Sequence, residues 1–240
     1  MLLARFAAER PVARAADLGS GSGVVALCLL ALGGAEEAVG VEFQEEMAER
    51  ACRSARWNGW PERARFLSGD VRAIRDLLPG GTFPLVVANP PYRPLSSGRV
   101  SPEPSCAVAR HEVACRLEDV LAAAAYLLED RGELCVVYPA RRLAALLEGC
   151  RAARLEPSVL RLVHPRAGEP ASLALLRCRK GGTEGLEVRW PLALHPGPGE
   201  EASGERYSAE AARLLGPPGV ADVAAPAPPE PSPAGPSPSG

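Results

Sequence analysis

The sequence predicts an α/β fold, with a mostly parallel sheet of seven strands, helices on both faces and a terminal antiparallel hairpin. Short apolar segments alternate with helix-like segments through most of the chain. A glycine-rich turn follows the first apolar segment, and the last two strand-like segments have no helix between them. Parallel strands need crossover helices, whereas adjacent strands without one favour an antiparallel pair.

The first strand, Val12–Leu18, is apolar and runs directly into the glycine-rich turn. Period-2 and helical spacing of apolar residues assign the elements that follow. The expected strands are 12–18, 38–42, 64–67, 84–88, 133–138, 155–164 and 171–179. The expected helices are 22–32, 44–57, 71–78, 115–128 and 140–153.

Length and composition predict one folded domain, residues 1–215, followed by a proline-rich tail, 216–240, that we expect to be disordered. The nine prolines between 217 and 240, with no aromatic residue, leave little surface to bury. The longest apolar run, Val24–Leu32, is too short to cross a bilayer. Seven cysteines without a Cys-x-x-Cys pair predict free thiols, a cytoplasmic location and no metal site.

A cofactor loop is predicted at Asp17-Leu18-Gly19-Ser20-Gly21-Ser22-Gly23. Alternate glycines permit a tight turn and close approach of a ligand, and dinucleotide-binding enzymes use a similar loop. An acid at Asp17 would repel a pyrophosphate but suits a cationic amino group, as in S-adenosylmethionine. We therefore expect Asp17, Gly19, Gly21 and Gly23 to bind that cofactor.

Two further acids follow later strands. Glu42 ends the second strand, where a carboxylate can accept both ribose hydroxyl protons. Asp70 follows the third strand and is expected to bind the adenine amino group, although an acid there can also serve as the N-cap of the helix starting at Val71.

The sequence Asn89-Pro90-Pro91-Tyr92 comes directly after the fourth strand. It resembles the motif of methyltransferases that act on amino groups of adenine, cytosine or glutamine. The Asn89 side-chain oxygen and the Pro90 carbonyl can each accept one amino hydrogen, which aims the nitrogen lone pair at the methyl group. Pro91 stiffens this turn, and Tyr92 can stack on a flat target. Asn89, Pro90, Pro91 and Tyr92 are therefore the expected catalytic residues, with Asn89 also beside the cofactor.

Over residues 1–215 the chain resembles the Rossmann-like class I methyltransferases of the tRNA(Val) adenosine N6-methyltransferase family. Besides the motif, the resemblance rests on residues 2–6, 109–112, 163–165, 170–173, 192–195 and 207–210. It implies methylation of the adenosine just 3′ of the valine anticodon, and no obligate protein partner is evident in the sequence. Together with Tyr92, Arg110 or His111 in the stretch 109–112 is then expected to contact the target nucleotide or its phosphate, although His111 can equally be a loop residue bonded to the neighbouring backbone.

Charge is consistent with this expectation, because residues 89–180 carry fourteen basic and ten acidic side chains. Unstacking the target base would cost a few kcal/mol. Members of the family also carry a segment ahead of the first helix, which this sequence lacks, and we expect its absence to weaken cofactor binding.

Other functions remain open at this point. A protein-glutamine methyltransferase acting on release factors shares the Asn-Pro-Pro-Tyr motif, as do DNA and ribosomal RNA amino-methyltransferases. A non-catalytic module with the same fold is an alternative of another class. A hydride-transferring dehydrogenase would have no use for the motif.

Overall fold

The computed structural model describes residues 1–90, 115–197 and 206–216. Within these ranges the strands form one nine-stranded sheet in the order β3-β2-β1-β4-β5-β7-β6-β8, with β9 also paired to β6. The strands are β1 Val12–Leu18, β2 Ala35–Glu42, β3 Ala64–Ser68, β4 Phe83–Ala88, β5 Leu128–Pro139, β6 Leu155–Arg166, β7 Leu173–Lys180, β8 Glu187–Val188 and β9 Leu192–His195.

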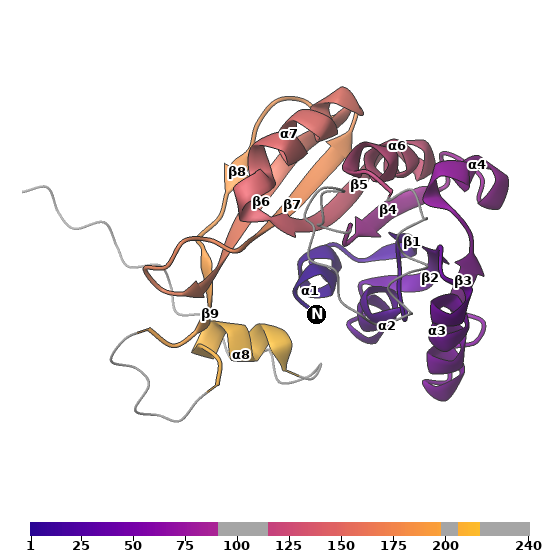
Figure 1. Cartoon of the computed structure of the whole chain (residues 1–240), viewed down its shortest axis with the longest axis horizontal. Helices are drawn as coiled ribbons and strands as arrows, with labels where there is room; N and C mark the ends of the chain where they lie inside the picture. Colours follow the sequence, from indigo (N-terminus) through magenta and orange to yellow (C-terminus); the bar gives the residue numbers. More distant parts are fainter. Residues whose placement is uncertain (91–114, 198–205, 217–240) are drawn as a thin grey trace, which may run out of the picture.

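Helices cover both faces of the sheet, with α1, α2 and α3 on one side and α4, α6 and α7 on the other (Figure 1). Each face has its own apolar core, because alternate residues of the strands point to opposite sides. The helical elements are α1 Leu2–Ala8, α2 Val24–Ala31, α3 Glu45–Trp57, η1 Val71–Ala73, α4 Ile74–Leu77, α6 Leu117–Leu127, η2 Ala140–Arg142, α7 Leu143–Ala152 and α8 Ala209–Leu215.

Strands β1 to β5 run parallel, and β7 runs antiparallel to both β5 and β6. The predicted fold class and closing hairpin are thus confirmed. The predicted count of seven strands is too low, because β8 and β9 run along the outer edge of β6. They cover backbone groups that an edge strand would leave open, and they are too short to show a periodic pattern.

Several boundaries differ from those predicted. Strand β5 begins at Leu128 rather than Glu133, since a polar stretch, 129–131, extends it beyond the apolar core. Strand β2 likewise begins at Ala35 rather than Ala38. The helices predicted at 71–78 and 140–153 each begin with a turn of 3₁₀ helix, a common way for a helix to start.

Helix α8 packs against β9 and α1, close to the other end of the described chain. The Ser208 N–H donates to the Leu194 carbonyl at 2.9 Å, and Arg5 donates to the Gly216 carbonyl at 2.6 Å. Residues up to 216 therefore pack with the same sheet. Of the predicted tail, only Gly216 lies inside the described residues.

A buried arginine joins α1 to the sheet. Arg177 on β7 is 1% exposed and donates to Glu133 on β5 at 2.8 Å and to the carbonyl of Phe6 on α1. Burial alone would raise the pKa of Glu133, but hydrogen bonds from Arg179 and Arg177 lower it. Helix α1 is thus held by charge as well as by its apolar face.

Candidate active site

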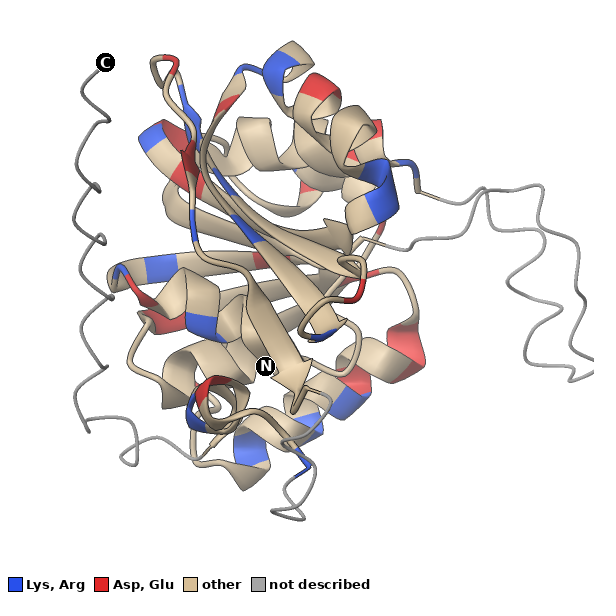
Figure 2. Ribbon diagram, turned by 90° about the vertical axis from the view of Figure 1, so that its left-hand side faces the viewer, with Lys and Arg blue, Asp and Glu red and all other residues tan. Residues whose placement is uncertain are grey.

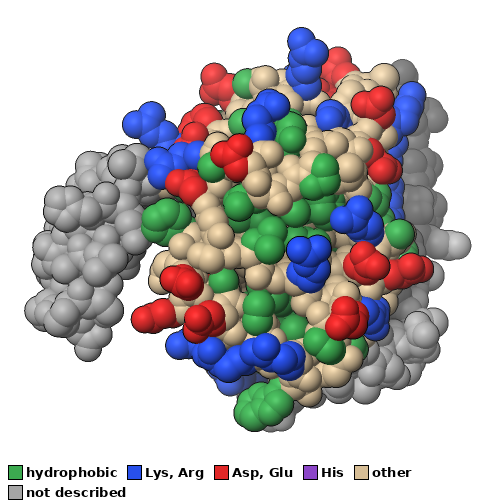
Figure 3. Space-filling model, turned by 90° about the vertical axis from the view of Figure 1, so that its right-hand side faces the viewer, with side chains coloured by type: hydrophobic (Ala, Val, Ile, Leu, Met, Phe, Trp, Pro, Cys, Tyr) green, Lys and Arg blue, Asp and Glu red, His purple; other side chains and the backbone are tan. Residues whose placement is uncertain are grey.

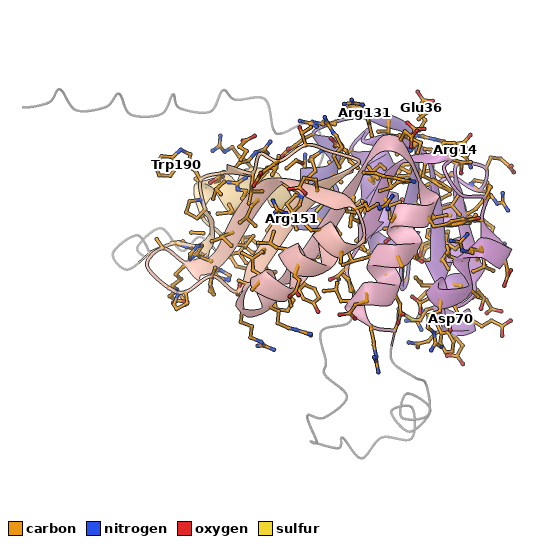
Figure 4. All side chains as sticks on the ribbon, turned by 90° about the horizontal axis from the view of Figure 1, so that it is seen from above. Arg14, Glu36, Asp70, Arg131, Arg151 and Trp190 are labelled. Atoms are coloured by element: carbon orange, nitrogen blue, oxygen red, sulfur yellow. The ribbon has the colours of Figure 1, made fainter. Side chains whose placement is uncertain are left out.

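The carboxyl ends of β1 to β5 meet at one edge of the sheet, where α/β folds bind ligands. Asp70, which follows β3, lies at this edge, opposite Arg14, Glu36 and Arg131 (Figure 4). No helix of the described residues is long and apolar enough to cross a membrane. Nor do they hold a group of three or more His, Cys, Asp or Glu that could bind a metal ion.

The glycine loop connects β1 to α2 and needs glycine at three positions. Gly19, Gly21 and Gly23 have φ angles of 70°, 55° and 80°, in the left-handed region that L-residues rarely adopt. At Gly23 a side chain would also collide with Phe66, whose Cζ lies 2.6 Å from an added Cβ. By contrast, an added Cβ at Gly19 would meet nothing within 4 Å. The loop therefore has open space beside Gly19 that a ligand can use.

Asp17 lies beneath this loop and is 2% exposed. Its Oδ2 accepts the Ala26 N–H at 3.2 Å, which ties the end of β1 to the first turn of α2. Burial raises the pKa of Asp17 to about 7, while the Ala26 hydrogen bond lowers it and the nearby Glu42 raises it further. A cationic group of a ligand would stabilise its ionised form.

Glu42 at the end of β2 holds the loop from the neighbouring strand. Its Oε2 accepts the Gly21 N–H at 2.8 Å and its Oε1 accepts the Gln44 N–H at 3.0 Å. A carboxylate has about four acceptor positions, so each oxygen retains capacity for a ligand hydroxyl. The side chain is 8% exposed, and Phe43 beside it is 48% exposed.

Asp70 is the N-cap of η1, which is one of the two roles that the sequence predicted for it. Its Oδ1 accepts the Arg72 N–H at 2.8 Å, and both carboxylate oxygens accept hydrogen bonds from the Arg72 side chain. The Arg72 side-chain hydrogen bonds lower the pKa of Asp70 below its usual range. Contact with the cofactor stays a prediction for Asp70, which here serves η1 and Arg72.

Asn89 follows β4 at the same level as Gly19 and Glu42. The register pairs Leu18 with Val41 on one side and with Ala88 on the other, so the next residue on each strand falls in one row. Neighbouring strands are about 4.8 Å apart, so Glu42 and Asn89 stand roughly 10 Å apart across Gly19. Three features far apart in the sequence thus form one row across β2, β1 and β4.

Asn89 is exposed, and Pro90 is buried. The other predicted catalytic and substrate residues, Pro91, Tyr92, Arg110 and His111, lie outside the described residues. The sequence interpretation missed Phe43, although its position directly after the strand-end acid is a usable signal. It also missed Arg72, whose only sequence signal is its position two residues after an acid.

These residues fit S-adenosylmethionine. Two buried carboxylates, Asp17 and Glu42, can accept hydrogen bonds from an amino group and from ribose hydroxyls. The open glycine loop between them admits a ligand without side-chain collision. The exposed ring of Phe43 offers an apolar face beside Glu42, which suits a nucleoside base.

Known proteins are similar to this chain over most of its length. A family model described as a methyltransferase domain matches residues 15–96. A tRNA1(Val) (adenine(37)-N6)-methyltransferase from Aeromonas hydrophila is 30% identical over 182 residues, 75% of this chain and 75% of that protein. One from Porphyromonas gingivalis is 30% identical over 179 residues, 72% of this chain and 67% of that protein.

Solved structures share the fold. A predicted O-methyltransferase from Agrobacterium tumefaciens has a TM-score of 0.67 and 24% identity, covering 88% of this chain and 94% of its own. The YcgJ protein from Bacillus subtilis has a TM-score of 0.54 and 15% identity, covering 76% and 99%.

The fold and the row of residues at its carboxyl edge define a class I S-adenosylmethionine-dependent methyltransferase. The cofactor expected from the glycine loop and its two acids is therefore the right one. The chain belongs to the tRNA1(Val) (adenine(37)-N6)-methyltransferase family.

Proposed function

We propose that this protein methylates N6 of an adenine in RNA, and that its substrate is the anticodon-loop adenosine of valine tRNA. The observation that carries the proposal is the row formed by Glu42, Gly19 and Asn89. The register of the strands brings the backbone of Asn89 to about two strand spacings from Glu42, the acid expected to bind the ribose. The names of the related enzymes support the choice of substrate.

The chemistry needs alignment more than acid–base catalysis. An adenine amino group is a weak nucleophile, because its lone pair is delocalised into the ring. We propose that Asn89 Oδ1 and the Pro90 carbonyl each accept one N6 hydrogen and so turn the lone pair out of the ring plane. Bound S-adenosylmethionine supplies an electrophilic sulfonium methyl group. Positioning of this kind can supply roughly 7–11 kcal/mol.

The cofactor residues divide the remaining tasks. We propose that Glu42 accepts hydrogen bonds from the ribose and that Asp17, with the glycines, holds the amino-acid end. Asp70 is proposed to lie beside the adenine. The proposed catalytic domain spans residues 1–215, which the packing of α8 against α1 and β9 supports.

The test is transfer of a radiolabelled methyl group from S-adenosylmethionine to unmodified tRNA, with nucleoside analysis of the product. N6-methyladenosine confined to valine tRNA is the expected result, and an Asn89→Ala variant serves as the blank. Label entering DNA, ribosomal RNA or a release-factor glutamine instead would refute the tRNA substrate while leaving amino methylation intact.

A further inference from the structure

The turn after β5 lies beside the row formed by Glu42, Gly19 and Asn89, which we call the catalytic row. Val136 on β5 pairs with Ala88 on β4, so Tyr138 is level with Pro90, about one strand spacing away. The chain then enters η2, which ends with Arg141 and Arg142. The Ala140 N–H donates to the Ser172 carbonyl at 3.0 Å, which fixes this turn to the segment leading into β7.

Two arginines at this turn, Arg141 and Arg142, are not matched by an acidic partner among the described residues. Arg141 is exposed, and the Arg142 guanidinium carbon lies 5.3 Å from the ring centroid of Tyr138, which is 1% exposed. Neither forms an ion pair within the described ranges. Elsewhere at this edge Arg72 pairs with Asp70.

The fold does not account for this placement. The segment from η2 into α7 has no acidic residue in its first turns, and two cations stand there instead. A helix begins with the positive end of its dipole, so cations at that end oppose the field. A local arrangement that costs stability is more often found where function requires it.

A second basic surface is a weaker candidate. Helix α3 carries Arg50, Arg53 and Arg56 near Trp57, but Arg53 pairs with Glu49. The face in Figure 3 carries basic and acidic side chains together. Helix α3 has thirteen residues, so Trp57 at its end lies about 20 Å from the catalytic row. Lysine and arginine residues are spread over the ribbon (Figure 2). A candidate RNA-binding site must therefore be recognised by its distance from the catalytic row and by the lack of acidic partners among the described residues.

We propose that Arg141 and Arg142 bind a backbone phosphate of the RNA next to the target adenosine. The inference rests on the proposed function and names how that site holds its substrate. A guanidinium presents a planar fork that matches two phosphate oxygens, and stacking on Tyr138 leaves its edge N–H groups available. Enzymes that turn a base out of its stack must hold the flanking backbone, and phosphate contacts do so without regard to sequence.

The experiment measures binding of unmodified valine tRNA over a range of salt concentrations. Wild-type protein is compared with an Arg141→Gln/Arg142→Gln variant and with Arg131→Gln, an exposed arginine at the opposite edge (Figure 4). Each lost phosphate contact should reduce the slope of log K against log salt by about 0.7–0.9. We expect that reduction, and a KM for tRNA raised at least about tenfold, only in the double variant. The Kd for S-adenosylmethionine should not change.

An Arg141→Lys/Arg142→Lys variant separates charge from folding, because it keeps both positive charges and should retain most of the salt slope. A wild-type slope in the double glutamine variant, with tRNA still methylated by the wild type, overturns this inference and leaves the proposed function standing. A wild-type protein that neither binds nor methylates RNA overturns both.

Discussion

Arg177 and Glu133 form a buried ion pair at 2.8 Å between β7 and β5, with the arginine side chain 1% exposed and the glutamate side chain 12% exposed. Replacing Arg177 by Met would leave Glu133 with less compensation and would release the carbonyl of Phe6. Removal of one partner of a buried pair typically costs about 3–5 kcal/mol. Urea denaturation should show a loss of that size for Arg177→Met.

Arg179 offers a matched control, because it pairs with Glu133 at the same distance but its side chain is 38% exposed. Arg179→Met should cost at most about 1 kcal/mol, as surface ion pairs do. Equal losses in the two variants would contradict the buried role assigned to Arg177.

Gly23 should tolerate alanine much less well than Gly33. Both have positive φ angles, 80° and 68°, so backbone strain alone costs roughly 1–2 kcal/mol in each. Only at Gly23 would the new Cβ meet Phe66 and Ala51 below 3 Å. Thermal unfolding should show a Tm for Gly23→Ala several degrees below that of Gly33→Ala, and similar values would mean that the loop shifts freely.

The free energy of unfolding should depend on pH through the titration of Asp17. Its pKa is about 7 in the folded chain against an ordinary value of 3.8, so the folded state binds the proton more tightly. Stability from this group is complete below about pH 4 and is lost as pH rises to about 7, by an amount on the order of 4 kcal/mol.

Asp17→Asn removes that titration, and its amide oxygen can still accept the Ala26 N–H. Denaturation from pH 4.5 to 8 should therefore show the stability of the variant rising relative to that of the wild type up to about pH 7, with no further change above it. Parallel stability profiles would show that Asp17 titrates normally.

Glu42→Gln should weaken cofactor binding. The amide keeps one acceptor oxygen but turns a donor toward a backbone N–H and loses the negative charge, so the charge-assisted hydrogen bond that we propose Glu42 accepts from a ribose hydroxyl is lost. Such bonds contribute about 1.5–3 kcal/mol each, which corresponds to a Kd for S-adenosylmethionine raised roughly 10- to 100-fold. Isothermal titration calorimetry measures this directly.

Asn89→Ala should have the opposite profile. The exposed side chain follows β4, and we propose that it holds the target amino group while Asp17 and Glu42 hold the cofactor, so cofactor affinity should stay within about twofold. Turnover should fall by roughly 10²–10³, the loss typical of one transition-state hydrogen bond. If Asn89→Ala and Glu42→Gln weaken cofactor binding equally, their roles are not separate.

Much of the fold could be predicted from the sequence, because the strands of a parallel sheet are short apolar runs ended by clear signals. The glycine loop, Glu42 and the Asn-Pro turn each follow such a run, so their shared edge was predictable. Their register was not, since pairing between strands depends on packing across the sheet. Strands β8 and β9 were not predicted, because segments of two and four residues are too short to show an alternation of apolar and polar residues.

The partners of the site residues were equally hidden. Nothing in the sequence shows that Asp17 accepts from Ala26 or that Arg72 engages Asp70 with both carboxylate oxygens, because such bonds depend on loop geometry. That neither Arg141 nor Arg142 forms an ion pair with another described residue can likewise be seen only in the coordinates. Residue type and position along the chain therefore predicted which side chains lie at this edge of the sheet. Their hydrogen-bond partners could be identified only from the structure.

Because the site is a row across β2, β1 and β4, catalytic activity depends on the correct register of these three strands. A slip of one residue in β4 would carry Asn89 out of line with Gly19 and turn its side chain toward the other face. Because residues on both faces of β4 are apolar and buried, a chain misaligned in that way would still be helical and compact, and far-UV circular dichroism would report it as folded. Such a chain would not transfer a methyl group, so specific activity measures the fraction of molecules whose central strands have paired correctly.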